Sequence, residues 1–252
     1  MRLHSAAILY NPLKASAHSL KDGISAFLRK RHIRILPAKK AQIIITVSGD
    51  GTMLYNKNRH SKPFFGIGSH TSCLCQSRYE NWQEDLGKII ENGFWVEKRL
   101  MLASSLGGKR LPDALNEVVV RNRKHRLMHI KLKAGGKEYF FRADGIIFCA
   151  PTGSGAYAYS CGGRKMPARA KRYQIVAIAP HRREFKPIIL DADAACTVQE
   201  DLQYHKRIGK DVQAIPSKPD AVVDGQFQEP LKRKDVLKIW KSEKSMELVR
   251  AR

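Results

Sequence analysis

The sequence has no long hydrophobic stretch and few cysteines, and each shortage excludes a class of protein. None of its apolar runs approaches the ~20 residues that a membrane-spanning helix requires. The five cysteines are odd in number, and only Cys73 and Cys75 lie close together, at a spacing that suits neither a zinc knuckle nor a redox pair. Residues 1–4 lack the apolar core of a signal peptide. We therefore expect a reduced, cytoplasmic protein that does not cross a membrane.

Acidic residues are scarce as well. The chain of 252 residues has 46 lysines and arginines against 23 aspartates and glutamates, which gives a formal net charge of +23. Such an excess favours anionic partners, namely nucleic acid, phosphate-rich small molecules or a membrane surface. The charge is spread along the chain, and no RNA-binding aromatic signature accompanies it. We interpret it as a solvated basic surface, with a basic nucleic-acid-binding protein as the alternative.

The pattern of apolar residues changes character near residue 95. The first part alternates strand-like and helix-like patterns, which predicts a parallel sheet of the α/β class. Its expected strands and helices are residues 6–10, 14–31, 43–47, 62–68 and 80–91. From Phe94 onward, short β-like runs separated by turn residues predict a β-sandwich or an open barrel. Two further short apolar runs follow at 235–240 and 246–249. The prediction is an α/β domain over 1–95 and a β-rich domain over 96–236.

The stretch Ser48–Thr52 joins the β-branched run 43–47 to a segment that can open a helix. In an open α/β sheet, such a turn lies at the carboxyl end of the strands, where ligands bind. Gly49 and Gly51 let the backbone approach a ligand closely and can direct N–H groups at phosphate oxygens. Asp50 would repel a phosphate unless it accepts a proton or holds Mg²⁺. An ordinary Asp-Gly turn is the alternative for this motif taken alone.

Asn116 and Glu117 lie inside an otherwise apolar, strand-like run, residues 114–120. An adjacent amide and carboxylate are costly to bury without partners, so this pair indicates either a site or a solvated strand end. His181 follows an apolar strand and a proline, and it could contact a phosphate or transfer a proton. A turn histidine without a function is the alternative. Asp224-Gly225-Gln226 is typical of a hairpin turn.

The richest stretch begins at Asp144. A buried-looking strand, residues 146–149, leads into a loop with two hydroxyls and two glycines, and the helix start expected at 156–160 would suit an anion or a ribose. The same loop matches the dinucleotide fingerprint G-x-G-x-x-A. Its surroundings are β-rich and no acidic residue ends the following strand, so a Rossmann unit is disfavoured.

Taken together, these motifs resemble the NAD kinase family. The stretch Ser48–Thr52 is similar to its Gly-Gly-Asp-Gly-Thr signature, and Asn116-Glu117 is similar to its Asn-Glu pair. Residues 144–163 resemble its longer second signature, which is the most specific of the motifs. Residues 179–188 and 224–226 are similar to two later family blocks, and the order and spacing agree along nearly the whole chain.

The resemblance implies phosphoryl transfer from ATP, or from polyphosphate in some members, to the 2′-hydroxyl of the adenosine ribose of NAD, which gives NADP. It implies a two-domain fold in which residues 237–252 return to the first domain, and it implies homodimers or homotetramers. Mg²⁺ or another divalent metal would bridge the donor phosphates.

The resemblance also implies roles for individual residues. A ribose hydroxyl is a poor nucleophile at neutral pH, so a base is needed, and Asp50 is the candidate. The amides of Gly49 and Gly51 would hold phosphate, while Asn116 and Glu117 would fix the substrate. Further residues expected to bind the two nucleotides are Thr52, Arg142, Asp144, Thr152, Ala156, Tyr157, Ser160 and His181. Arg142 would lie near the new 2′-phosphate, and His181 near the transferred group.

The sequence departs from the family pattern at four places. The departures are Ser48 for the first glycine of the short signature, Gly66–His70 for Gly-Ile-Asn and a further glycine, Cys73-Leu74-Cys75 for Gly-Phe-Leu, and Gly155 for a hydroxyl residue. They keep open a catalytically degenerate nucleotide-binding protein. The short signature alone is shared with lipid and sugar kinases of the same superfamily, which are the other alternative.

Overall fold

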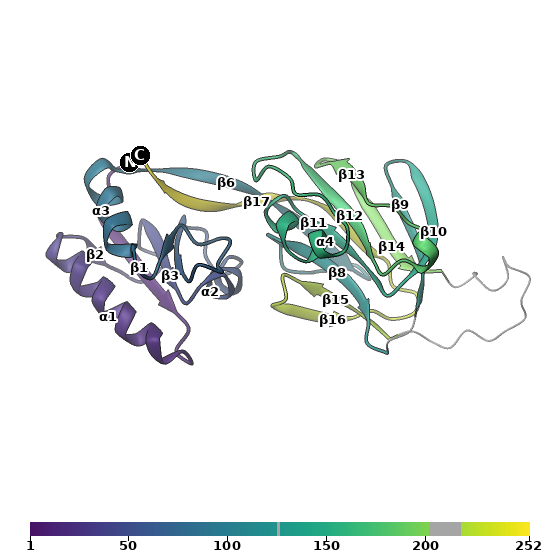
Figure 1. Ribbon diagram of the computed structural model, residues 1–252, viewed down its shortest axis with the longest axis horizontal. Coiled ribbons are helices and arrows are strands. Elements are labelled where there is room, and N and C mark those ends of the chain that lie inside the picture. Colours follow the sequence, from purple (N-terminus) through teal and green to yellow (C-terminus); the bar gives the residue numbers. More distant parts are fainter. Residues whose placement is uncertain (125–126, 202–217) are drawn as a thin grey trace, which may run out of the picture. The chain divides into compact units, whose positions relative to one another are not determined.

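The computed structural model describes residues 1–124, 127–201 and 218–252 (Figure 1). The chain divides into two compact units, the first made of Met1–Arg99 with Met246–Arg252, and the second of Leu100–Ser245. Within the described residues, no helix is both long and apolar enough to span a bilayer.

The first unit is built on a parallel sheet, as its alternating pattern predicts. The strand order is β2-β1-β3-β4-β5, and each neighbouring pair is parallel. The central strand β3 is buried at every position, which explains its unbroken run of β-branched residues. The elements of this unit are β1 (Ser5–Tyr10), α1 (Ala15–Lys30), β2 (Arg34–Ile35), β3 (Ile43–Val47), α2 (Asp50–Asn56), β4 (Phe64–Gly68), β5 (Ser77–Arg78) and α3 (Trp82–Asn92).

The apolar stripes of α1 and α3 cover one face of this sheet. Ile24 and Leu28 of α1 and Leu86 of α3 belong to one buried cluster with the inward side chains of β3. The rings of Phe27 and Trp82 join the two helices edge to face, with 5.4 Å between their centroids. This packing fixes the carboxyl end of β3, from which the glycine turn starts.

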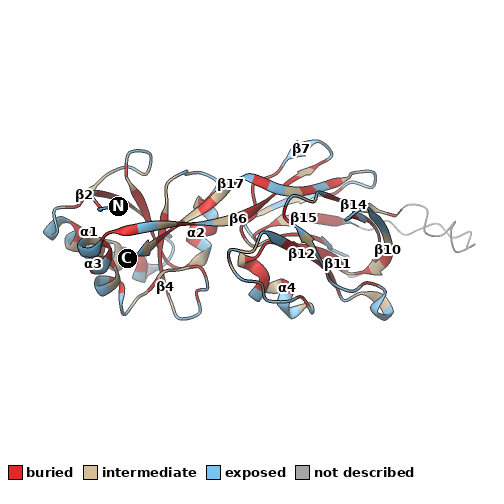
Figure 2. Cartoon of the chain, turned by 90° about the horizontal axis from the view of Figure 1, so that it is seen from above, coloured by how far each residue is buried: buried red, intermediate tan, exposed pale blue. Residues whose placement is uncertain are grey.

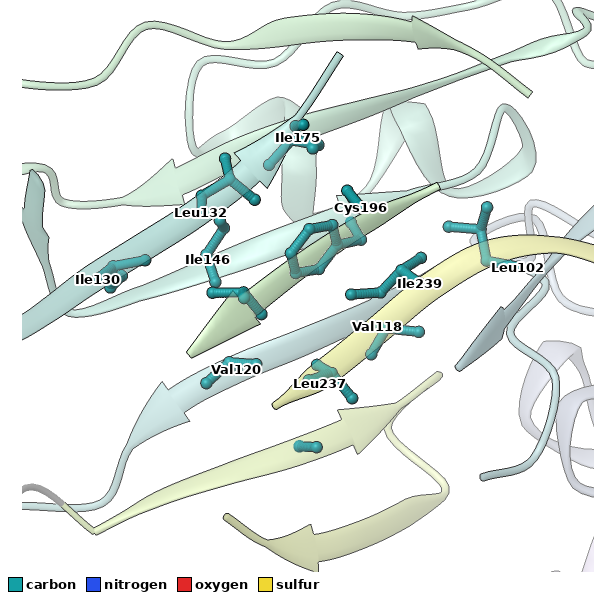
Figure 3. Packing of buried hydrophobic residues seen from close by; sticks show 14 of the residues in the cluster. Leu102, Val118, Val120, Ile130, Leu132, Ile146, Ile175, Cys196, Leu237 and Ile239 are labelled. Atoms are coloured by element: carbon teal, nitrogen blue, oxygen red, sulfur yellow. The ribbon is translucent and has the colours of Figure 1, made fainter. Parts of the chain in front are cut away.

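The second unit is a β-sandwich, which confirms the fold expected for the later part of the chain. One layer is an antiparallel sheet of order β13-β12-β11-β8-β15-β16, and the facing layer contains β10-β9-β14-β17. Figure 3 shows the core between them, where Val118 and Ile146 of the first layer pack near Leu132 and Ile239 of the second. The elements are β6 (Phe94–Leu106), β7 (Lys109–Arg110), β8 (Glu117–Asn122), β9 (Met128–Ala134), β10 (Lys137–Ala143), β11 (Gly145–Cys149), η1 (Thr152–Gly155), α4 (Tyr157–Ser160), β12 (Arg172–Ile178), η2 (His181–Arg183), β13 (Ile188–Asp191), β14 (Cys196–Glu200), β15 (Pro219–Val223), β16 (Phe227–Pro230) and β17 (Leu237–Ala251).

The C-terminal runs 235–240 and 246–249, expected as separate short segments, belong to the single long strand β17 except for residues 235 and 236, which precede it. Buried and exposed positions alternate along much of it, and the charged stretch between the runs only interrupts the apolar pattern (Figure 2). In the second unit β17 pairs with β14, and in the first unit its Leu248 pairs with Phe64 of β4. Both β17 and β6 therefore contribute residues to each unit.

Candidate active site

The glycine turn follows β3 directly and leads into α2, as the sequence predicts. Ser48 has φ +92° and Gly49 has φ +88°, so two successive residues occupy the left-handed side of backbone space. Glycine adopts this conformation freely, whereas a residue with a Cβ is strained there. Asp50 is the first residue of α2 and Thr52 is buried within it, while Gly51 is exposed.

The Asp50 carboxylate is held by three consecutive backbone amides. Its Oδ2 accepts the N–H of Cys73 at 2.6 Å, and its Oδ1 accepts those of Leu74 at 3.0 Å and Cys75 at 3.2 Å. These three bonds use only main-chain atoms of the 73–75 segment, so they do not depend on its side chains. The Cys75 thiol also interacts with the Asp50 carboxylate, and burial together with this interaction raises the pKa of Cys75 to about 12.

The departure at Gly68 is matched by its neighbours. A Cβ on Gly68 would lie 2.3 Å from Ser72 Oγ and 2.9 Å from Cys75 Sγ, which is closer than real contacts allow. A Cβ on Gly66 would lie 2.5 Å from the Cε of Met53 on α2. The family has asparagine at position 68. In this chain the side chains of Ser72 and Cys75 fill the space that a side chain at position 68 would need, so the glycine and its two neighbours are compatible.

Replacing Ser48 with the family's glycine is expected to stabilise the protein. A non-glycine residue at φ +92° stores about 1–3 kcal/mol of strain. Glycine recovers that strain but loses about 0.5–1 kcal/mol to the greater freedom of the unfolded chain. For Ser48→Gly, urea unfolding should therefore give a free energy of unfolding about 1 kcal/mol above that of the wild type. A decrease would show that Ser48 Oγ makes a stabilising contact that outweighs the backbone strain.

In the second unit, Asn116 and Glu117 stand at the start of β8, where Asp224 binds the backbone. The Asp224 carboxylate accepts the amide N–H groups of Leu115 at 2.8 Å, Asn116 at 2.8 Å and Glu117 at 3.0 Å. Asp224 follows β15 in the tight turn to β16, so the predicted hairpin is confirmed. The sequence indicates that turn but gives no sign that its carboxylate serves residues more than one hundred positions earlier.

In the second unit, two buried polar atoms of the signature residues have no hydrogen-bond partner among the described residues. They are Oε2 of Glu117 and Oγ1 of Thr152. Burial, together with the nearby negative charge of Asp224, raises the pKa of Glu117 to about 7. Unpaired buried polar atoms are costly and are commonly satisfied by a bound molecule. Their position in two separate motifs points to a ligand site at this end of the sandwich.

The long signature packs directly on Asn116. Ala150 donates its N–H to Asn116 O at 2.9 Å, and a Cβ on Gly153 would lie 2.5–2.7 Å from the backbone of Asn116. Glycine at 153 is thus required for the approach that places Thr152 beside the Asn-Glu pair. The strand before the loop, β11, lies between the antiparallel β8 and β12, so the G-x-G-x-x-A match is not a Rossmann unit.

The helix expected after this loop is only the four-residue turn α4. It is too short to supply an appreciable dipole, so the expected anion site at its N-terminus is not supported. Its Tyr157 is half-buried and packs beside Ala158, while Ala156 and Ser160 are exposed. Burial raises the pKa of Tyr157, as do the charges of Asp144 and Glu117, which places these groups in one neighbourhood.

Arg142 and His181 lie together in the second unit, and Glu184 joins them. Arg142 Nη2 lies 2.7 Å from His181 Nδ1, and Glu184 accepts from both the backbone and the guanidinium of Arg142. The hydrogen bond from Arg142 lowers the pKa of Glu184 to about 2. His181 Nδ1 is also 3.0 Å from Glu184 Oε1. In the tautomer without a hydrogen on Nδ1, this nitrogen accepts a hydrogen bond from Arg142, and in the tautomer with one it donates to Glu184. Sequence reasoning missed Glu184.

Lys14 is a second residue that sequence reasoning missed. It precedes α1, and its ammonium donates to the carbonyl oxygen of Ser48 at 3.2 Å, at the start of the glycine turn. The Asn-Pro-Leu-Lys sequence directly after β1 is the pattern that could have indicated it, because that segment also lies at the carboxyl edge of the sheet.

The donors for a metal ion are few. The described residues contain no group of three or more His, Cys, Asp and Glu side chains that could hold one. Both carboxylate oxygens of Asp50 already accept backbone amides. This arrangement fits Mg²⁺ held mainly by phosphates and water, which is how Mg²⁺ commonly binds in phosphoryl-transfer sites.

Comparisons with known proteins agree with this geometry. The model of the ATP-NAD kinase C-terminal domain family matches residues 115–251, which is more than half of the chain. The NAD kinase of Methanothermobacter thermautotrophicus is 32% identical over 216 residues, which cover 83% of this chain and 72% of the relative.

Two solved structures share the fold. The NAD kinase from Archaeoglobus fulgidus in complex with ATP has a TM-score of 0.80 at 24% identity, over 98% of this chain and 94% of that one. The yeast NADH kinase complexed with NADH has a TM-score of 0.85 at 16% identity, over 98% of this chain and 83% of that one. The two structures show the shared fold, while the family model and the archaeal relative establish that the chain belongs to the NAD kinase family.

Proposed function

We propose that this protein is an NAD kinase that transfers the γ-phosphoryl group of ATP to the 2′-hydroxyl of the adenosine ribose of NAD and so forms NADP. The observation that carries the proposal is Asp50. It lies between the two signature glycines, and three backbone amides of residues 73–75 hold its carboxylate. Membership of the family supports the reaction class. The bonds that hold Asp50 do not depend on the side chains of the altered 73–75 segment, which argues against catalytic degeneration.

The chemistry follows from the position of each group. Asp50 accepts the proton of the ribose hydroxyl, and its amide contacts orient the carboxylate before the substrate binds. The Gly49 N–H already donates to the carbonyl oxygen of Ile67 at 3.2 Å, so the N–H of Gly51 and the ammonium of Lys14 at the same turn supply the donor and the positive charge for the donor phosphates. Mg²⁺, when bound, neutralises the charge that develops on those phosphates.

The second unit supplies the NAD-binding residues in this proposal. Glu117 and Thr152 offer the buried polar atoms that have no partner among the described residues, and the backbone of Asn116 packs against Gly153 of the same loop. Asp144, Ala156, Tyr157 and Ser160 complete the set. Arg142 and His181 offer positive charge and a proton donor to the transferred phosphoryl group, while Glu184 fixes their orientation.

An NADP-forming assay tests the proposal. NAD or NADH is supplied with ATP·Mg²⁺ or with polyphosphate, and the product is measured with an NADP-specific dehydrogenase. We expect NADP with ATP as donor. Folded protein that binds NAD and forms no product with either donor would instead identify a nucleotide-binding relative that has lost catalysis.

We also propose a cytoplasmic homodimer or homotetramer. The family resemblance supports an oligomer, and the five cysteines, all within the described residues, remain unpaired as in a reducing compartment. Sedimentation equilibrium measures the assembly directly, and a monomer at micromolar concentration would contradict it.

A further inference from the structure

Asp224 closes a ring of hydrogen bonds around the start of β8. Besides the three amides that its carboxylate accepts, its own N–H donates to the carbonyl oxygen of Glu117 at 3.0 Å. The residue is 5% exposed and has φ +50°. The turn after β15 and the strand end at Leu115–Glu117 are therefore joined by four bonds that come from one residue.

These bonds continue the pairing of β15 with β8 beyond the last paired residues of the two strands. The strands pair as far as Val223 and Val118, and beyond that point the Asp224 carboxylate accepts the amide N–H groups of residues 115–117. Two carboxylate oxygens can accept three N–H groups in charge-assisted bonds. An asparagine would offer one oxygen and would turn its NH₂ toward an N–H, so the backbone of the Asn-Glu pair depends on a carboxylate at this position.

The Asp224 charge also acts on the Glu117 side chain. Burial raises the pKa of Glu117 to about 7, and Asp224 contributes to the rise. The other titratable groups near Glu117 are Cys149 of β11 and Tyr157 of α4. Burial raises the pKa of Cys149 to about 12 and that of Tyr157 above its ordinary value, so both are uncharged near neutral pH. The charge of Arg121 lowers the pKa of Tyr157, and the charge of Asp144 raises it.

We propose that Asp224 is a positioning residue for NAD, which both fixes the backbone of the Asn-Glu pair and sets the charge of Glu117. This inference rests on the proposed function. Below pH 7, Glu117 carries a proton and can donate a hydrogen bond from its otherwise unpartnered Oε2 to an acceptor atom of NAD. As the pH rises through 7, that proton is lost, and NAD affinity falls.

The test is the dissociation constant of NAD, measured by calorimetry at pH values on both sides of 7, for the wild type and Asp224→Asn. The variant should bind NAD about tenfold more weakly or worse, because charge-assisted bonds to the strand end are lost. Its midpoint of pH dependence should move to lower pH, because a negative charge beside Glu117 has been removed. Asp235→Asn is the matched control, since the Asp235 carboxylate accepts the amide N–H of Lys232 at 2.9 Å in an exposed turn, away from Glu117.

Each outcome decides the inference. Weaker binding with an unmoved midpoint would overturn the charge role, and unchanged binding would overturn both roles. If Asp224→Asn does not fold, Glu117→Gln replaces it, and NAD binding that still changes with pH in that variant would overturn the inference. Wild-type protein that binds no NAD at any pH would count against the proposed function itself.

Discussion

Asp50→Asn is expected to lower the rate of NADP formation by about 10³-fold while NAD remains bound, because general-base catalysis typically contributes 10²- to 10⁴-fold. The amide of asparagine cannot accept the proton of the ribose hydroxyl. The proposed NAD-binding residues, Asn116 and Glu117 among them, belong to the second unit and are untouched by the change. Single-turnover kinetics and the dissociation constant of NAD measure the two effects separately.

The structure adds a condition to this experiment. Asparagine offers one acceptor oxygen where Asp50 accepts three amides, so the 73–75 segment loosens in the variant. Thermal unfolding shows how much of the loss comes from that change. Asp85→Asn is the matched control in the same unit, since it weakens a 2.7 Å bond from Ser77 Oγ and should keep its activity. Near-normal turnover in Asp50→Asn would exclude Asp50 as the base.

Gly153→Ala is expected to abolish measurable NAD binding and to destabilise the second unit. The new Cβ would meet the O, C and Cα atoms of Asn116 at 2.5–2.7 Å, and backbone atoms cannot move aside cheaply. Overpacking of this kind typically costs 1–3 kcal/mol. The strain falls on the contact between residue 153 and the backbone of Asn116, which holds the loop with Thr152 against the Asn-Glu pair. Calorimetric titration with NAD and thermal unfolding measure the two effects.

The same loop provides a control two residues away. A Cβ on Gly155 would meet only Lys165 Cε, at 4.0 Å, and the backbone there is not in the left-handed region. Gly155→Ala, and Gly155→Ser with the hydroxyl typical of the family, should therefore bind NAD like the wild type. Equal effects of alanine at 153 and 155 would show that the contact with Asn116 does not position the loop.

Local features of the fold and site were predictable from the sequence because they depend on residues close together in the chain. The β-branched run of β3, the glycines of the turn and the helical spacing of α1 each determine their own conformation. The hairpin at Asp224 follows from Asp-Gly in the same way. For this reason the glycine turn and the parallel sheet were correctly placed.

Contacts between distant segments were not predictable, because nothing in a single sequence pairs them. Asp224 binds amides 107 to 109 residues away, and Glu184 binds Arg142 across 42 residues. The compatibility of Gly68 with Ser72 and Cys75 is likewise visible only in the packing. The pKa of Glu117 depends on burial and on Asp224, so the titration of that carboxyl also lay beyond the sequence pattern.

The most direct test of the central claim follows the phosphoryl group itself. ATP labelled in its γ-phosphate is incubated with NAD, Mg²⁺ and the purified protein, and the labelled product is digested to establish which ribose hydroxyl carries the phosphate. We predict label on the 2′-hydroxyl of the adenosine ribose with the wild type, and almost none with Asp50→Asn. Label released only as inorganic phosphate, or none transferred by folded protein, would contradict the assignment as an NAD kinase.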